Sequence, residues 1–125
     1  MDITFTDREL DIMNVLWESD GATVAEVQAA LHDDLAYTTV LTILRTLEEK
    51  GHVDHTEEGR AYRYHALVDR DQAGASAVRR ILRKVFGGSP ELMLTHLVAE
   101  RELTQDQIEA MQKLLSERLD EGGAK

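Results

Sequence analysis

The chain has 125 residues, of which 42% are hydrophobic and 30% charged, with 24 acidic and 14 basic side chains and no cysteine. This length allows one domain or two very small ones, and the composition excludes a wholly disordered chain. The lack of cysteine excludes disulfides, thiolate metal sites and cysteine nucleophiles. No apolar run approaches the roughly 18 residues of a membrane span, and no basic segment precedes an apolar one at the N-terminus. We therefore expect a soluble, cytoplasmic protein without membrane insertion.

The acidic excess is concentrated in the first half of the chain. Residues 1–68 contain 14 acidic and 5 basic side chains, whereas residues 69–125 contain 10 and 9. The net charge of −10 argues against nonspecific attraction of the whole molecule to nucleic acid. The shift in composition predicts two domains, residues 1–68 and residues 69–125.

Three helices are predicted in the first half. Thr6-Asp7-Arg8-Glu9 and Thr23-Val24-Ala25-Glu26 both match the capping-box signature, and apolar residues follow each at helical spacing. The first helix should end near Asp20-Gly21. The third should run from 37 to 50, where Gly51 closes it.

The third helix is amphipathic. At 100° per residue, its apolar side chains fall within an arc of about 100°. They are Val40, Ile43, Leu44 and Leu47. The opposite side carries mostly small hydroxyl side chains, where an ordinary solvated face would carry more glutamate and lysine.

A β-hairpin should follow, because the pattern changes from a period of 3.6 to a period of 2 after Gly51. Residues 52–56 and 61–66 are the predicted strands, and residues 57–60 the turn. The expected register pairs His52 with His65, Val53 with Tyr64, Asp54 with Arg63, and His55 with Tyr62. The opposite charges of Asp54 and Arg63 favour this register.

Three helices and a hairpin are the order of a winged helix-turn-helix, so we predict a mainly α fold with a small hairpin. The major groove, about 12 Å wide, admits one helix whose outer side chains are short and polar. Such a helix could read DNA while the wing contacts the backbone. The candidate DNA-binding residues are Tyr37, Thr38, Thr39, Thr42, Arg45, Thr46, Arg60 and Arg63.

Two alternatives stay open for this face. The threonines could be merely exposed while Arg45 pairs with Glu49 one turn later. Winged helices also serve as protein-interaction modules, so the fold alone does not decide the function.

Helices are also predicted over 71–86 and 92–98 and after Thr104, where Gln107 completes a further capping box. They are too few to bury a good core alone. A symmetric dimer would cover their apolar surface and space two reading helices about 34 Å apart. The candidate dimerisation residues are Leu92, Leu94, Leu97, Val98, Ile108, Met111, Leu115 and Leu119. The alternative is a monomer whose C-terminal helices fold back on the first half.

Several motifs together resemble the penicillinase repressor family of the BlaI, MecI and CopY type. They are residues 6–17, Thr23-Val24-Ala25-Glu26-Val27, Leu35-Ala36-Tyr37-Thr38-Thr39-Val40, Lys50-Gly51, Tyr62-Arg63-Tyr64 and Leu103-Thr104-Gln105-Asp106. The run Ala36-Tyr37-Thr38-Thr39-Val40 is the most specific. The resemblance implies a transcriptional repressor that binds a palindromic DNA operator as a homodimer. It also implies that the outward residues of the third helix and the wing face the DNA.

The resemblance bears on induction as well. Copper-responsive members carry a C-terminal cysteine motif, which this chain lacks. Penicillin-responsive members are inactivated by proteolysis in the dimerisation region after a signal from a membrane sensor metalloprotease. The matching bond here lies near His96–Leu97, where the best-known members have Asn-Phe, so cleavage at this bond is a hypothesis.

The remaining groups of polar residues do not predict a metal site or a catalytic site. His52 and His65 could share a face of the hairpin, but two ligands are too few for a closed zinc site. The cluster Arg79, Arg80, Arg83 and Lys84 could touch flanking phosphates, although a solvated face that pairs with acidic residues is the simpler interpretation. No nucleophile triad, phosphate loop or metal motif is present. We therefore expect no enzyme activity, no metal and no cofactor.

Overall fold

The computed structural model describes residues 3–122. The chain divides into two compact units, Met1–Arg79 and Arg80–Lys125, and the boundary lies inside helix α4 (Arg70–Lys84). This boundary lies eleven residues after Val68, where the shift in charge composition predicted it. The first part of α4 belongs to the N-terminal unit because Ser76 is buried there, and its hydroxyl bonds both the N–H and the carbonyl of Ile3.

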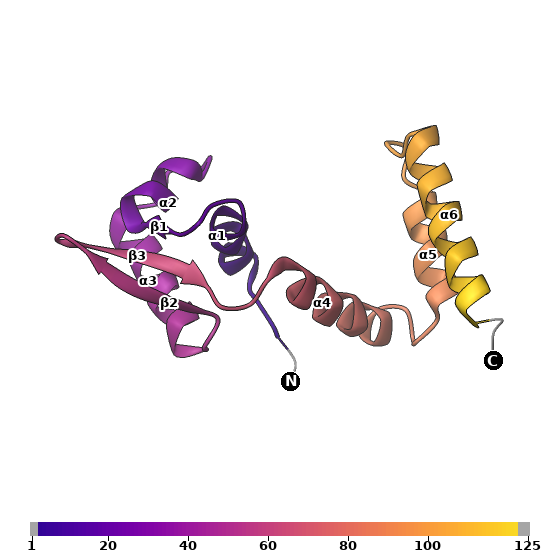
Figure 1. The fold of residues 1–125 in the computed structure, drawn as a ribbon, viewed down its shortest axis with the longest axis horizontal. Coiled ribbons are helices and arrows are strands. Elements are labelled where there is room, and N and C mark those ends of the chain that lie inside the picture. The colour runs from indigo at the N-terminus through magenta and orange to yellow at the C-terminus, as the bar shows by residue number, and fades with distance from the viewer. Residues whose placement is uncertain (1–2, 123–125) are drawn as a thin grey trace. The chain divides into compact units, whose positions relative to one another are not determined.

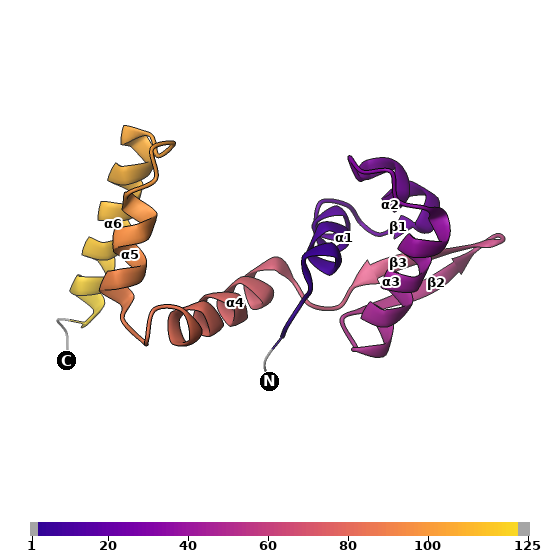
Figure 2. The same ribbon diagram turned by 180° about the vertical axis from the view of Figure 1, so that it is seen from behind.

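Before α4, the N-terminal unit contains three helices and a small sheet (Figures 1 and 2). The helices are α1 (Asp7–Trp17), α2 (Val24–Ala30) and α3 (Tyr37–Glu49). The strands are β1 (Ala22–Thr23), β2 (Val53–Glu58) and β3 (Ala61–Ala66), all antiparallel in the order β1-β3-β2. The sequence did not predict β1, which is only two residues long and therefore has no period.

One hydrophobic core joins every element of this unit from α1 to β3. Its largest members lie on the inner faces of the helices and on the sheet. The buried residues are Ile12, Met13, Leu16, Ala22, Val24, Val27, Val40, Leu44, Leu47, Val53 and Tyr64. The core fixes the rotation of α3, because Val40, Leu44 and Leu47 are fully enclosed while Ile43 is partly buried.

The predicted capping boxes are confirmed. In α1 and α2 the threonine hydroxyl accepts from the backbone N–H of the glutamate, and the glutamate accepts from that of the threonine. Thr104 and Gln107 bond in the same reciprocal way before α6 (Gln105–Gly122). A further box that the sequence did not predict, between Asp69 and Gln72, opens α4.

The predicted hairpin register is wrong by two residues. Val53 pairs with Ala66, His55 with Tyr64 and Thr56 with Arg63. The turn is the two-residue loop Gly59-Arg60, in which Gly59 has a φ of 63°, a value that favours glycine. Because the error is an even number of residues, each side chain keeps its predicted face.

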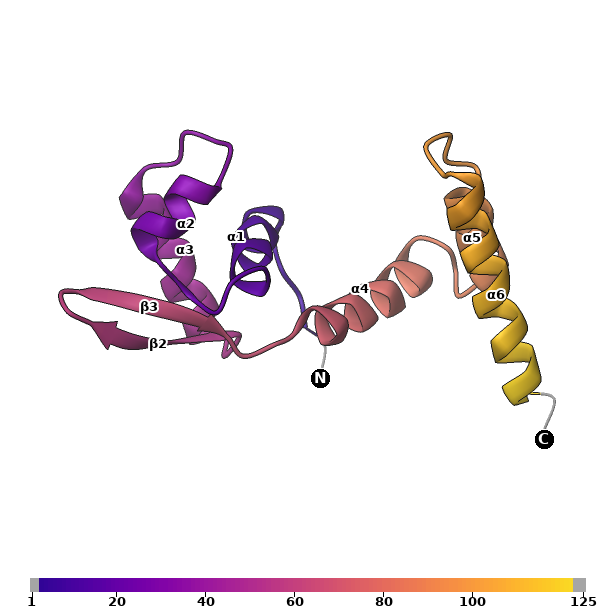
Figure 3. The same cartoon turned by 45° about the horizontal axis from the view of Figure 1, so that its top comes forward.

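The C-terminal unit contains the helices α5 (Pro90–Val98) and α6, which run in opposite directions (Figure 3). Ser89 caps α5 by accepting from the N–H of Leu92, and Pro90 occupies the first turn. Neither helix contains a buried residue.

Candidate nucleic-acid interface

The outward face of α3 is the most distinctive surface of the N-terminal unit. Tyr37, Thr38, Thr39, Thr42 and Arg45 are exposed, and Thr46 is partly buried. The buried stripe of α3 lies on the opposite side, so the core holds this row toward the outside. Arg45 makes no ion pair within residues 3–122, which argues against the alternative pairing with Glu49.

The N-terminus of α3 differs from those of α1 and α2. Its N-cap residue is Ala36, and no side chain in the described part of the chain bonds to the first N–H groups. Helix N-termini without a cap leave backbone donors free and carry a partial positive charge, which suits a phosphate oxygen. The loop before α3 is held in place because Gln28 Nε2 donates to the carbonyl of Leu35 at 3.0 Å.

The two arginines of the hairpin are in different situations. Arg60 is exposed in the turn, which extends beyond the helices (Figure 1), and it has no ion-pair partner in the described residues. Arg63 contacts the carboxylates of Glu58 at 2.6 Å and Glu26 at 3.1 Å, and it donates to the carbonyl of Gly21. Its hydrogen bond to Glu58 and the nearby carboxylates raise the pKa of Arg63. Arg63 thus ties β3 to α2 and to the loop before β1.

A contact between α3 and the wing was not predicted. The carboxylate of Glu48 lies 2.8 Å from His55 Nδ1, which connects the last turn of α3 to β2. The ring of Tyr62 stacks on that of His55, with centroids 4.3 Å apart. No sequence signal marks this contact, because its partners come from two different elements.

A second ion pair connects α1 and α3. Lys50 Nζ lies 2.9 and 2.8 Å from the two carboxylate oxygens of Glu9, whose side chain is only 5% exposed. Burial raises the pKa of Glu9, but the hydrogen bonds from Lys50 and from the Thr6 backbone outweigh it, so the pKa is lowered. The pair holds the end of α3 against the start of α1.

The histidines of the hairpin do not gather. His52 precedes β2 and packs its ring against Phe5, with centroids 4.9 Å apart, whereas His65 lies beside Thr56. The expectation that His52 and His65 pair across the hairpin is therefore wrong, because His65 is opposite Asp54. No three metal-ligating side chains come together anywhere in residues 3–122.

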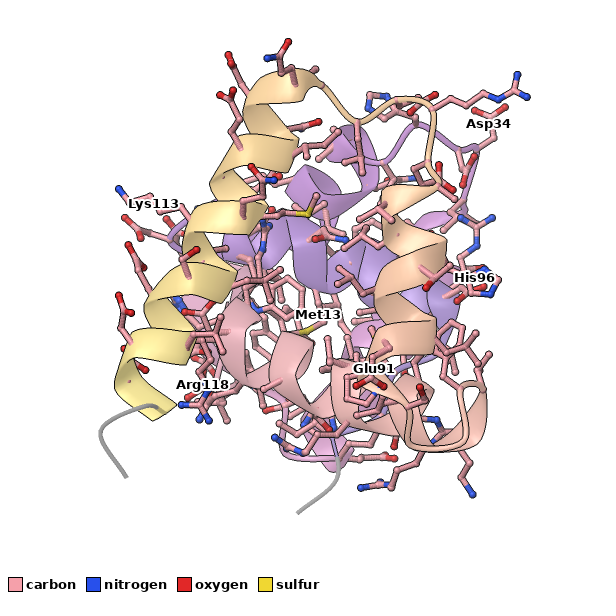
Figure 4. All side chains as sticks on the ribbon, turned by 90° about the vertical axis from the view of Figure 1, so that its right-hand side faces the viewer. Met13, Asp34, Glu91, His96, Lys113 and Arg118 are labelled. Atoms are coloured by element: carbon pink, nitrogen blue, oxygen red, sulfur yellow. The ribbon has the colours of Figure 1, made fainter. Side chains whose placement is uncertain are left out.

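The C-terminal unit exposes a large apolar surface. On α5 and α6 the exposed large apolar side chains are Leu92, Leu97, Val98, Ile108, Leu114, Leu115 and Leu119, and the exposed fraction reaches 75% at Leu119. Leu94 and Met111 are partly buried. In Figure 4, His96 projects from the side of α5 away from α6, while Lys113 and Arg118 project from α6. His96 also contacts the ring of Phe86, with centroids 5.3 Å apart.

Three helices around one core, a hairpin wing and an outward third helix define the winged helix-turn-helix class. No helix in the described residues is long and apolar enough to cross a membrane. The family model described as penicillinase repressor matches residues 5–117, and the chain belongs to this family of transcriptional regulators. The family predicted from the sequence motifs is thereby confirmed.

Named relatives agree with this assignment. The transcriptional regulator BlaI of Mycobacterium tuberculosis (strain ATCC 25618 / H37Rv) is 36% identical over 115 residues, which cover 89% of this chain and 82% of that protein. The methicillin resistance regulatory protein MecI of Staphylococcus aureus (strain N315) is 22% identical over 112 residues, with coverages of 88% and 91%.

Solved structures support the fold. The DNA binding domain of the repressor BlaI is similar with a TM-score of 0.51 and 29% identity, over 58% of this chain and 93% of that chain. A MarR family protein from Bacillus stearothermophilus is similar with a TM-score of 0.54 and 16% identity, over 98% of this chain and 78% of that chain. The second likeness concerns the fold alone. The predicted fold class, mainly α with a small hairpin, is confirmed.

Proposed function

We propose that this protein is a transcriptional repressor that binds a palindromic operator in double-stranded DNA as a homodimer. The observation that carries the proposal is the outward face of α3, which presents exposed Thr38, Thr39 and Thr42 together with Arg45, a side chain that has no ion-pair partner among residues 3–122. Short hydroxyl side chains and one guanidinium suit the floor of the major groove, where an arginine can bond a guanine through two N–H groups. We propose that the protein acts by binding DNA and has no enzyme activity. We place it in the cytoplasm, where the chromosome lies.

We assign the contacts by their chemistry. Thr42, Arg45 and Thr46 lie toward the base edges, while Tyr37, Thr38 and Thr39 lie at the uncapped end of α3, which suits the phosphates. Arg60 at the wing tip completes the set. Arg63, also predicted from the sequence, has its guanidinium committed to Glu26 and Glu58, so we give it the role of holding the wing in position.

The homodimer rests on the apolar surface of α5 and α6. A soluble monomer rarely exposes this many large apolar side chains together, and a second copy would cover them. The same region offers a release mechanism, in which a protease cuts the His96–Leu97 bond. Both residues are exposed, and α5 has no buried residue, so local opening of this short helix should be easy.

Selection from a random duplex library, followed by gel shifts, tests the function. A repressor should enrich one palindromic sequence, and its affinity should fall at least about 10-fold between 50 and 200 mM salt. The acidic charge of residues 1–68 favours the alternative of a protein-interaction module, which would enrich no sequence. Cleavage is tested by the mass of the chain in cells exposed to penicillin, where an intact chain would refute the release mechanism.

A further inference from the structure

The hydroxyl hydrogens of Thr42 and Thr46 are already used inside α3. Thr42 Oγ1 donates to the carbonyl of Thr38 at 2.9 Å, and Thr46 Oγ1 donates to the carbonyl of Thr42 at 3.0 Å. A threonine hydroxyl has a single hydrogen and two acceptor lone pairs. While that hydrogen stays bonded to the helix carbonyl, each of these hydroxyls can accept a hydrogen bond from a bound molecule but cannot donate one.

The other polar groups of this face are available as hydrogen-bond donors. Arg45 has five N–H donors and no acceptor. The hydroxyls of Thr38 and Thr39 make no hydrogen bond within residues 3–122, so they keep a hydrogen to donate. Phosphate oxygens are acceptors, which suits Thr38 and Thr39 and does not suit Thr42 and Thr46.

In the major groove, the exocyclic amino groups of adenine and cytosine are the donors, whereas guanine and thymine present acceptor oxygens. We propose that Thr42 and Thr46 determine operator specificity by accepting hydrogen bonds from adenine or cytosine amino groups, beside a guanine bound by Arg45. This inference rests on the proposed function, because it requires α3 in the major groove. It goes further by assigning a donor or acceptor role to each side chain.

The test begins with selection from a random duplex library by the wild type, Thr42→Val and Thr46→Val. Valine replaces the hydroxyl with a methyl group of similar shape, so each variant should lose its preference at one base pair per half-site. Thr42→Ser keeps the hydroxyl and should keep the preference. Thr39→Val is the matched control, and it should weaken binding to all sequences alike. Thermal melting of each variant confirms that it is folded.

Base analogues then identify the contacted atom at the relaxed base pair. The amino group is removed with purine in place of adenine or 2-pyrimidinone in place of cytosine. The acceptor oxygen is removed with 2-aminopurine in place of guanine or 5-methyl-2-pyrimidinone in place of thymine. Loss of the amino group should weaken the wild type about 3- to 10-fold and weaken Thr42→Val no further. Loss of the oxygen should affect both proteins equally.

Two results would overturn the inference while leaving the repressor function intact. One is a coupling between Thr42 and the acceptor oxygen, which would mean that the hydroxyl donates. The other is an unchanged base preference in both valine variants. Failure of the wild type to select any sequence would instead refute the proposed function and, with it, this inference.

Discussion

The ion pair between Glu9 and Lys50 allows a quantitative test of how α3 is held. Replacing Lys50 with methionine keeps most of the side chain's length and removes the ammonium, which bonds both oxygens of a nearly buried carboxylate. Hydrogen bonds to charged groups contribute about 1.5–3 kcal/mol. The Lys50 side chain is 39% exposed, so solvent screening reduces the expected loss of unfolding free energy to about 1–2 kcal/mol.

The assay is urea unfolding followed by the fluorescence of Trp17, the single tryptophan, whose indole N–H donates to the carbonyl of Val68 at 2.8 Å. A double-mutant cycle with Glu9→Gln isolates the pair, since glutamine can still complete the capping box. The control is Arg118→Met, whose ion pair with Glu121 is exposed and should contribute almost nothing.

The pH dependence has a definite sign. The pKa of Glu9 is lowered in the folded protein, so the stabilisation is complete above the ordinary glutamate value and is lost as the pH falls through the lowered one. Glu9→Gln should remove this acid-sensitive step. A coupling energy below about 0.3 kcal/mol at neutral pH would refute the reasoning.

Further predictions concern two glycines and the dimer. Gly21→Ala should lower the free energy of unfolding by about 1–3 kcal/mol, because φ of Gly21 is 102° and a Cβ would lie 2.6 Å from the ring of His65. Gly74→Ala, in open space within α4, should instead stabilise by about 0.5–1 kcal/mol, and urea unfolding would show both effects. Leu115→Glu should give a monomer with weakened operator binding, whereas Lys113→Glu, which places the same side chain about 160° around α6 from Leu115, should remain a dimer. Sedimentation velocity distinguishes the two, and an unchanged dimer in Leu115→Glu would contradict the assignment.

The helices could be predicted because their signals are local. Capping boxes mark the starts of α1 and α2, whereas apolar spacing and the closing Gly51 mark α3. The same spacing separated the buried and outward faces of α3. The hydrogen bonds of the Thr42 and Thr46 hydroxyls could also have been predicted, because a threonine hydroxyl in a helix can donate to the backbone carbonyl four residues earlier.

The sheet was harder because its partners are distant in sequence. A shift of two residues leaves the alternation of the strands unchanged, so the pattern could not select the register. The charges of Asp54 and Arg63 suggested a pair, but Arg63 instead contacts Glu26 on α2, a partner that no local rule identifies. The contact of Glu48 with His55 was missed for the same reason.

The measurement that tests the central claim most directly is the affinity of Arg45→Ala for the selected operator, beside Arg118→Ala on α6. If α3 reads the major groove, loss of the Arg45 guanidinium should cost about 1–3 kcal/mol, which is about a 5- to 150-fold weaker Kd. Arg118→Ala should bind as the wild type does. An unchanged binding curve for Arg45→Ala would contradict the claim that this face of α3 contacts the bases.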